Sequence, residues 1–195
     1  MTEKEILSLF DKYGALLKGH FKLSSGLHSE KYLQCALVLQ YPDIAEKLSS
    51  TLAKKFSKTK IDVVVAPALG GITLAHEIAR ALGVRGLFTE RRPSQGSQEG
   101  KMGLRRGFSI EKGEKVLVVE DVITTGGSTK EVIGVVKALG GKVIGVGSVI
   151  DRSSKNLDFG VPFLSLAKVN VETFEEKDCP LCKKSIAVTK PGSRK

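Results

Sequence analysis

The chain has 195 residues, with no tryptophan, 6% aromatic residues and only three cysteines. An odd number of cysteines argues against a disulfide framework and favours a reducing compartment. No stretch approaches the roughly 18 consecutive apolar residues that a membrane span requires. Residues 1–11 are charged and helical in pattern, unlike the apolar segment of a secretory signal. We therefore expect a globular cytoplasmic protein that does not enter a membrane.

The charge balance is strongly basic, with 31 Lys and Arg residues against 21 Asp and Glu residues. A net charge of +10 raises the local concentration of polyanions. A nucleic-acid-binding protein usually gathers its basic residues into one stripe with aromatic side chains, which are scarce here. We favour a small polyanionic substrate and expect no nucleic-acid partner. A basic RNA-binding protein remains an alternative, and many lysines are simply solvated.

The hydrophobic pattern changes near residue 60. Before it, we expect a helix over about residues 3–17, an extended hairpin over 20–39 and a helix from Pro42 to about Phe56. After it, strands and helices alternate, with strands at 61–66, 84–88, 115–119 and 143–150 and helices at 72–82 and about 128–139. This alternation predicts an α/β fold with a doubly wound, mostly parallel sheet flanked by helices.

We expect a single domain over residues 1–195. A small hood would comprise about residues 1–58 together with the C-terminal segment 170–195, and the core would comprise about residues 60–168. The tail from Asp178 has few apolar residues and is expected to pack only loosely.

The most informative stretch is residues 116–129, VLVVEDVITTGGST. Its first four residues predict a buried parallel strand that stops where Glu120 and Asp121 begin. In open α/β sheets, ligands bind at the carboxyl ends of the strands, and the helix N-termini beyond them present N–H groups to phosphate. The hydroxyl- and glycine-rich loop after the acids suits an anion, whereas the acids would repel a bare phosphate. The ligand should therefore carry both a phosphate and a diol.

This stretch closely resembles the type I phosphoribosyltransferases, in which two neighbouring acids hold the ribose hydroxyls of phosphoribosyl pyrophosphate and the following loop holds its 5-phosphate. The resemblance implies a donor site formed by Glu120, Asp121, Val122, Ile123, Thr124, Thr125, Gly126, Gly127 and Ser128. It also implies that pyrophosphate binds at the earlier turn formed by Leu69, Gly70 and Gly71. Taken alone, the glycines of that turn are explained equally well by packing.

Residues 89–106 form a long polar segment that we interpret as a lid. Its basic side chains could neutralise departing pyrophosphate and exclude water. We assign Arg91, Arg92 and Lys101 to pyrophosphate, and we add Lys101 to Glu120 and Asp121 as a catalytic residue. Arg105 and Arg106 could equally open the next strand.

Asp151 and Arg152 follow the strand over 143–150, and the arginine could bind a flat, oxygen-rich ring. The alternative is a surface ion pair between the two neighbours. Nearly the entire chain, including residues 24–29, the acidic pair and the Cys179-Pro-Leu-Cys182 unit, is similar to the orotate phosphoribosyltransferases. That resemblance implies that Arg152 and Thr124 contact orotate, and that the products are orotidine 5′-monophosphate and pyrophosphate in pyrimidine biosynthesis.

The resemblance further implies Mg²⁺ without a direct protein ligand, with Asp121 as an outer-shell partner, and a homodimer. Two departures stand out: Gly70 occupies the place where many orotate enzymes have a lysine, and residues 89–106 contain no histidine. Lid catalysis by histidine is therefore excluded. A purine or uracil phosphoribosyltransferase, or a non-catalytic regulator that senses phosphoribosyl pyrophosphate, remains an alternative function.

Cys179 and Cys182 have the spacing of metal ligands, but a zinc site needs about four ligands, and the sequence has no second Cys-x-x-Cys unit or histidine pair. We therefore favour a turn without metal, since Cys35, His20, His28 and His76 could complete a site only through the fold. His28 could instead face the ligand, and His76 is expected to pack within its helix.

Overall fold

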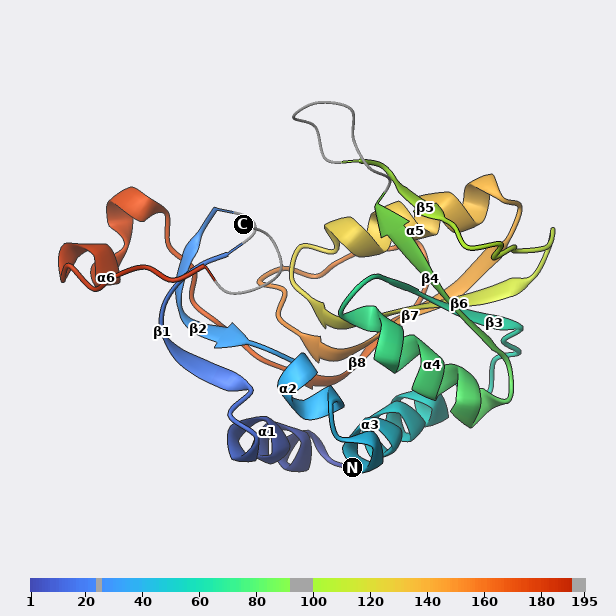
Figure 1. The fold of residues 1–195 in the computed structure, drawn as a ribbon, viewed down its shortest axis with the longest axis horizontal. Helices are drawn as coiled ribbons and strands as arrows, with labels where there is room; N and C mark the ends of the chain where they lie inside the picture. The colour runs from blue at the N-terminus through green and yellow to red at the C-terminus, as the bar shows by residue number, and fades with distance from the viewer. Residues whose placement is uncertain (24–25, 92–99, 191–195) are drawn as a thin grey trace.

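The computed structural model describes residues 1–23, 26–91 and 100–190 (Figure 1). Its main sheet has the order β5-β4-β3-β6-β7-β8, and a separate two-stranded sheet pairs β1 with β2. The strands of the main sheet are β3 (Val63–Pro67), β4 (Arg85–Arg91), β5 (Met102–Leu104), β6 (Lys115–Ile123), β7 (Lys142–Asp151) and β8 (Phe163–Lys168). All are parallel except β5, which pairs antiparallel with β4 at one edge. The predicted mostly parallel sheet is confirmed.

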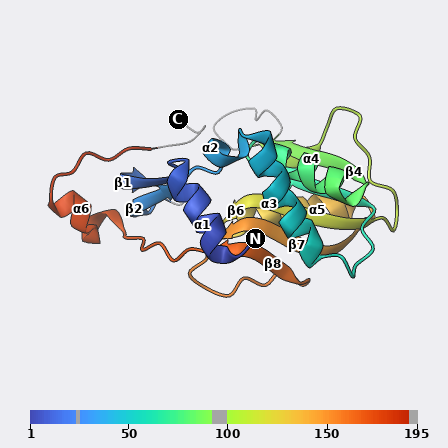
Figure 2. The same ribbon diagram turned by 90° about the horizontal axis from the view of Figure 1, so that it is seen from below.

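Helices cover both faces of this sheet because its central strands are apolar on both sides. On one face, α1 (Glu3–Lys12), α3 (Pro42–Lys55) and α4 (Gly71–Leu82) pack on residues such as Val64 and Leu117. On the other, α5 (Gly127–Ala138) packs on alternate residues such as Val63 and Val116. Figure 2 shows α1 and α3 in front of the strands. This doubly wound arrangement matches the prediction.

The strands β5 and β8 were not predicted, and β5 and the end of β4 lie within residues 89–106, the segment interpreted as a lid. Two predicted ends of elements were also wrong. The first helix ends at Lys12 rather than near residue 17, because Gly14 adopts a positive φ of 62° and turns the chain into the next strand. The strand predicted to stop at Val119 continues as β6 to Ile123, with Val122 paired to Ile150 of β7. The two acids thus lie within the last residues of a strand and not in the loop beyond it.

The hood consists of the hairpin β1 (Leu16–Lys22) and β2 (His28–Leu33), the short helix α2 (Ala36–Leu39) and the C-terminal segment. That segment contains η1 (Glu176–Asp178) and α6 (Pro180–Lys183), which lie beside the hairpin at the end of the molecule away from α4 and α5 (Figure 1). Thr189 exchanges backbone hydrogen bonds with His20 and Lys22, and Cys179 is fully buried. From residue 183 to 190 every residue is exposed, so the prediction that the tail packs loosely holds there, although these contacts fix the course of the tail.

Within the described residues, no helix combines the length and apolar character needed to cross a membrane.

Candidate active site

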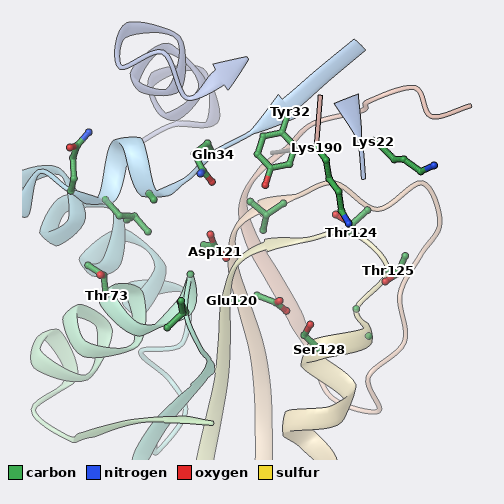
Figure 3. Close-up of a pocket in the computed structure, with 18 residues that line it drawn as sticks. Lys22, Tyr32, Gln34, Thr73, Glu120, Asp121, Thr124, Thr125, Ser128 and Lys190 are labelled. Carbon is green, nitrogen blue, oxygen red and sulfur yellow. The ribbon is translucent and has the colours of Figure 1, made fainter. Parts of the chain in front are cut away.

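A cavity of about 700 Å³ lies at the carboxyl ends of β3 and β6 (Figure 3). The chain leaves β3 toward β4 on one side of the sheet and leaves β6 toward β7 on the other, so the strand order reverses between β3 and β6. Open α/β sheets bind ligands at this reversal. The loops after both strands line the cavity, and the hood closes it from above.

The loop after β6 forms one wall, to which Thr124, Thr125, Gly126, Gly127 and Ser128 all contribute. Gly126 has a φ of 74° and is the N-cap of α5, with no side-chain hydrogen bond at that cap. The first N–H groups of α5 are thus available to an anion. A Cβ on Gly126 would stand 2.8 Å from Phe159 Cε1, so both backbone and space require glycine. This wall can hold a phosphate.

Glu120 and Asp121 line the cavity just before that loop. Burial raises the pKa of Glu120 to about 7, opposed by the hydrogen bond that Thr129 Oγ1 donates to it, and the charge of Asp121 raises it further. Burial also raises the pKa of Asp121, although the N–H groups of Val122 and of Asp121 itself lower it. Two poorly solvated carboxylates will bind hydroxyl donors or cations strongly, which suits a diol.

The turn after β3 forms the opposite wall through Leu69 and Gly70. The Ala68–Leu69 peptide bond is cis, and Leu69 is 71% exposed. A Cβ at Gly70 would lie 2.9 Å from Asp121 Oδ2, so this glycine lets the turn approach the acid closely. Gly71 does not line the cavity; it begins α4, where a Cβ would meet Ala66 Cβ at 2.7 Å. Packing explains Gly71, and closeness to Asp121 explains Gly70.

The hood and tail supply cavity residues that the sequence did not reveal: Lys22, Tyr32, Gln34 and Lys190, together with Thr73 from α4. Lys190 points from the hood toward the loop that carries Thr124 and Thr125 (Figure 3). Two lysines at the rim favour a polyanion. The alternating pattern of the hairpin could have indicated that Tyr32 faces inward. Lys190 could not have been identified, because the basic tail around it has the composition of a solvated surface.

Arg152 is only 8% exposed, and its Nε and Nη2 have no hydrogen-bond partner among the described residues. Burial lowers its pKa, while the nearby Tyr32 opposes this. Asp151 does not serve as its ion-pair partner; it accepts hydrogen bonds from Ser153 and lies 3.5 Å from Lys168 Nζ. Arg152 is not one of the residues lining the cavity, but Tyr32 is. The arginine thus has unused donors next to a cavity residue.

Of the predicted lid residues, those that the structure describes do not lie in the cavity. Arg91 makes two hydrogen bonds of 2.9 and 2.8 Å to Glu131, and Lys101 is exposed; neither lines the cavity. Arg92 lies outside the described residues. Arg106 pairs with Glu90 at 2.8 Å, which agrees with a structural role for it. The pyrophosphate role of these lid residues stays a prediction.

Three further residues, Ile123, His28 and His76, do not lie where the sequence analysis predicted them. Ile123 is buried under the loop and does not line the cavity. The prediction that His28 could face the ligand was wrong, because it is 2% exposed and hydrogen-bonded to His20 inside the hood. His76 is exposed on α4 rather than packed.

Comparisons with known proteins agree with this geometry. Residues 38–175 match the family model described as "Phosphoribosyl transferase domain". A protein of Caldanaerobacter subterraneus named orotate phosphoribosyltransferase is 56% identical over 195 residues, covering 100% of both chains. The structure of orotate phosphoribosyltransferase from Aeropyrum pernix has a TM-score of 0.68 at 26% identity, covering 84% of this chain and 93% of that one. An adenine phosphoribosyltransferase from Rhodothermus marinus shares the fold, with a TM-score of 0.66 at 20% identity over 84% of this chain and 99% of that one.

Proposed function

Because the chain belongs to the phosphoribosyl transferase domain family and, within it, to the orotate phosphoribosyltransferases, we propose that its cavity transfers the phosphoribosyl group of 5-phosphoribosyl 1-pyrophosphate to orotate. The products are orotidine 5′-monophosphate and pyrophosphate, in de novo pyrimidine biosynthesis. One observation carries the assignment to this cavity: two half-buried carboxyls and a helix N-terminus without a side-chain cap among the described residues share a wall at the reversal of the strand order.

The reaction breaks the bond between the anomeric carbon and pyrophosphate while the ring nitrogen of orotate bonds to that carbon and gives up its proton to the departing pyrophosphate or to water. By analogy with glycoside chemistry, positive charge develops on the ribose ring. Glu120 and Asp121 accept hydrogen bonds from the ribose hydroxyls and place negative charge beside the ring. The N–H groups of residues 125–128 hold the 5-phosphate, so the sugar is fixed at both ends.

The residues present fit Mg²⁺ as a partner of the substrate. Carboxylate oxygen is the ligand type that Mg²⁺ prefers, and the Asp121 carboxylate lies against Gly70 in the turn assigned to pyrophosphate. Asp121 would hold the ion through water, with substrate oxygens as its direct ligands. When bound, Mg²⁺ neutralises charge on the leaving group.

Arg152 favours orotate over the alternative bases. Orotate has a carboxylate, whereas uracil, adenine and hypoxanthine have none, and the buried guanidinium has two donors without protein acceptors in the described structure. A carboxylate or ring oxygen of the base would satisfy them. The fold alone does not select the base, since an adenine enzyme shares it.

Three finer proposals rest on resemblance. The enzyme acts as a homodimer. It works in the cytoplasm, and its three free cysteines agree with a reducing compartment. The lid closes over pyrophosphate with Arg91, Arg92 and Lys101. Gly71, which starts α4, belongs to the pyrophosphate turn and contributes its backbone N–H group.

A direct assay tests the proposal. The protein is incubated with Mg²⁺, phosphoribosyl pyrophosphate and, separately, orotate, uracil, adenine, hypoxanthine or xanthine, and base consumption is followed. We expect only orotate to be consumed, and Asp121→Asn to abolish most turnover while keeping the fold. Consumption of another base would reassign the enzyme, and donor binding without turnover of any base would indicate a regulator.

A further inference from the structure

The hood brings together four potential metal ligands outside the active site: His20, His28, Cys179 and Cys182. One ligand atom of each lies within 4.8 Å of the corresponding atom of every other. His20 comes from β1, His28 from β2, and the cysteines flank the start of α6. The sequence separates the two pairs by about 150 residues, so the missing second pair is supplied by the fold. We propose that this cluster is a structural zinc site.

Three of the sulfur–nitrogen distances in the cluster suit tetrahedral zinc. Cys182 Sγ lies 3.3 Å from His28 Nδ1 and 3.8 Å from His20 Nε2, and Cys179 Sγ lies 3.6 Å from His20 Nε2. With ordinary Zn–S and Zn–N bond lengths, a tetrahedral site requires sulfur and nitrogen to be about 3.6 Å apart. The two ring nitrogens, at 2.8 Å, would need to move apart by only about 0.5 Å for the same geometry.

The hydrogen bond at one ring nitrogen of His20 leaves its other ring nitrogen, which faces the cluster, free to bind a metal. His20 Nδ1 lies 2.7 Å from the carbonyl oxygen of Ile186, which can only accept, so Nδ1 carries the proton and Nε2 presents a lone pair to the cluster. Zinc-bound histidines characteristically donate their other N–H in this way.

His28 supplies a second argument. Its Nε2 is buried without a hydrogen-bond partner among the described residues, and it lies 3.9 Å from Glu176 Oε2. If the His28 Nδ1 proton bonds His20, Nε2 is unprotonated and faces a carboxylate that is also paired with Lys22, so the buried nitrogen has no donor to offer it. If Nδ1 binds a metal, the proton moves to Nε2 and faces Glu176 favourably. The metal-bound arrangement therefore satisfies both rings.

The site would fasten the tail to the hairpin close to the active site. Lys22 follows His20 by two residues, and Thr189 bonds both residues through its backbone just before Lys190. Lys22 and Lys190 line the substrate cavity. Zinc bound by both segments would hold these two lysines in place, so its loss should loosen substrate binding as well as lower stability.

The full-length protein, purified under reducing conditions and dialysed against zinc, tests this directly. We expect about one zinc per chain by elemental analysis. Replacement by Co²⁺ should give the visible absorption of a tetrahedral ion with thiolate charge-transfer bands. Zinc removal by a chelator should lower the unfolding temperature and raise the KM for the donor, and added zinc should restore both.

Matched variants separate the cluster from other thiols and imidazoles. Cys182→Ser and His28→Asn should reduce bound zinc to about one-tenth or less, whereas Cys35→Ala and His76→Asn, at positions outside the cluster, should retain it. Wild-type protein that binds no zinc or cobalt with its thiols reduced, or that holds a Cys179–Cys182 disulfide instead, would overturn the proposal. Equal zinc loss in the control variants would do the same. These readouts do not depend on base consumption.

Discussion

The raised pKa of Glu120 predicts that replacing this residue stabilises the unliganded fold, although the same replacement should lower turnover. Its pKa is about 7 in the folded chain against an ordinary value of 4.5. Because the folded pKa is the higher one, the protonated carboxyl favours folding below about pH 4.5, and that contribution is lost as the pH rises through 7. In the unliganded protein, ionised Glu120 should therefore destabilise the fold above pH 7.

The size of the effect follows from the two pKa values. The interval between 4.5 and about 7, at about 1.36 kcal/mol per pH unit, corresponds to about 3 kcal/mol at pH 8 and under about 1 kcal/mol at pH 5. Glu120→Gln cannot ionise, and its amide oxygen can still accept from Thr129. The variant should thus gain up to about 3 kcal/mol over wild type at pH 8 and much less at pH 5.

Urea unfolding of the unliganded protein at pH 5, 6, 7 and 8 measures this difference, and Glu30→Gln, at an exposed position of β2, is the control. Turnover of Glu120→Gln should fall about 10- to 100-fold, because a charge-assisted hydrogen bond to the ribose is weakened. If the stability gain were the same at every pH, or absent at pH 8, the assigned burial of an ionised Glu120 would be refuted.

Further substitutions test the other parts of the site. Arg152→Ala should raise the KM for orotate about 100-fold with little change for the donor; equal losses in steady-state kinetics would refute base recognition. Gly126→Ala, which forces a side chain at φ 74° against Phe159, should lose donor binding and stability by about 1 kcal/mol or more. Gly127→Ala meets only Thr125 Oγ1 at 3.7 Å and should match wild type in thermal unfolding; equal destabilisation would contradict this. Gly70→Ala should displace Asp121 and raise the donor KM, and an unchanged KM would count against their contact.

The local pattern was sufficient to predict the four central strands of the main sheet, because their apolar runs are evident in the sequence, whereas the edge strands β5 and β8 were not predicted. The apolar run at 116–119 indicates a strand buried on both faces, and the glycine-rich loop after Glu120 and Asp121 indicates an anion site. The predicted site residues from Glu120 to Ser128 do line the cavity, apart from Ile123, which is buried. The strand boundary was misjudged because acids at a ligand site look like the end of a strand, although pairing with β7 continues through them.

The hood was expected to combine residues 1–58 with residues 170–195, but the contacts between these two segments could not be predicted, because they join residues far apart in the sequence. Backbone bonds from Thr189 to the hairpin place Lys190 at the cavity, and nothing in the tail's composition indicates that register. His20 and His28 meet Cys179 and Cys182 only after the tail has folded back. The burial of Arg152, whose Nε and Nη2 find no acceptor in the described part of the chain, likewise depends on what the fold places around it.

A crystal structure of the protein with phosphoribosyl pyrophosphate and Mg²⁺ tests the central claim most directly. We expect the 2′- and 3′-hydroxyls within hydrogen-bond distance of Glu120 and Asp121, and the 5-phosphate on the N–H groups at the start of α5. A donor bound with its phosphate elsewhere, or with its hydroxyls turned away from the two carboxylates, would contradict the account.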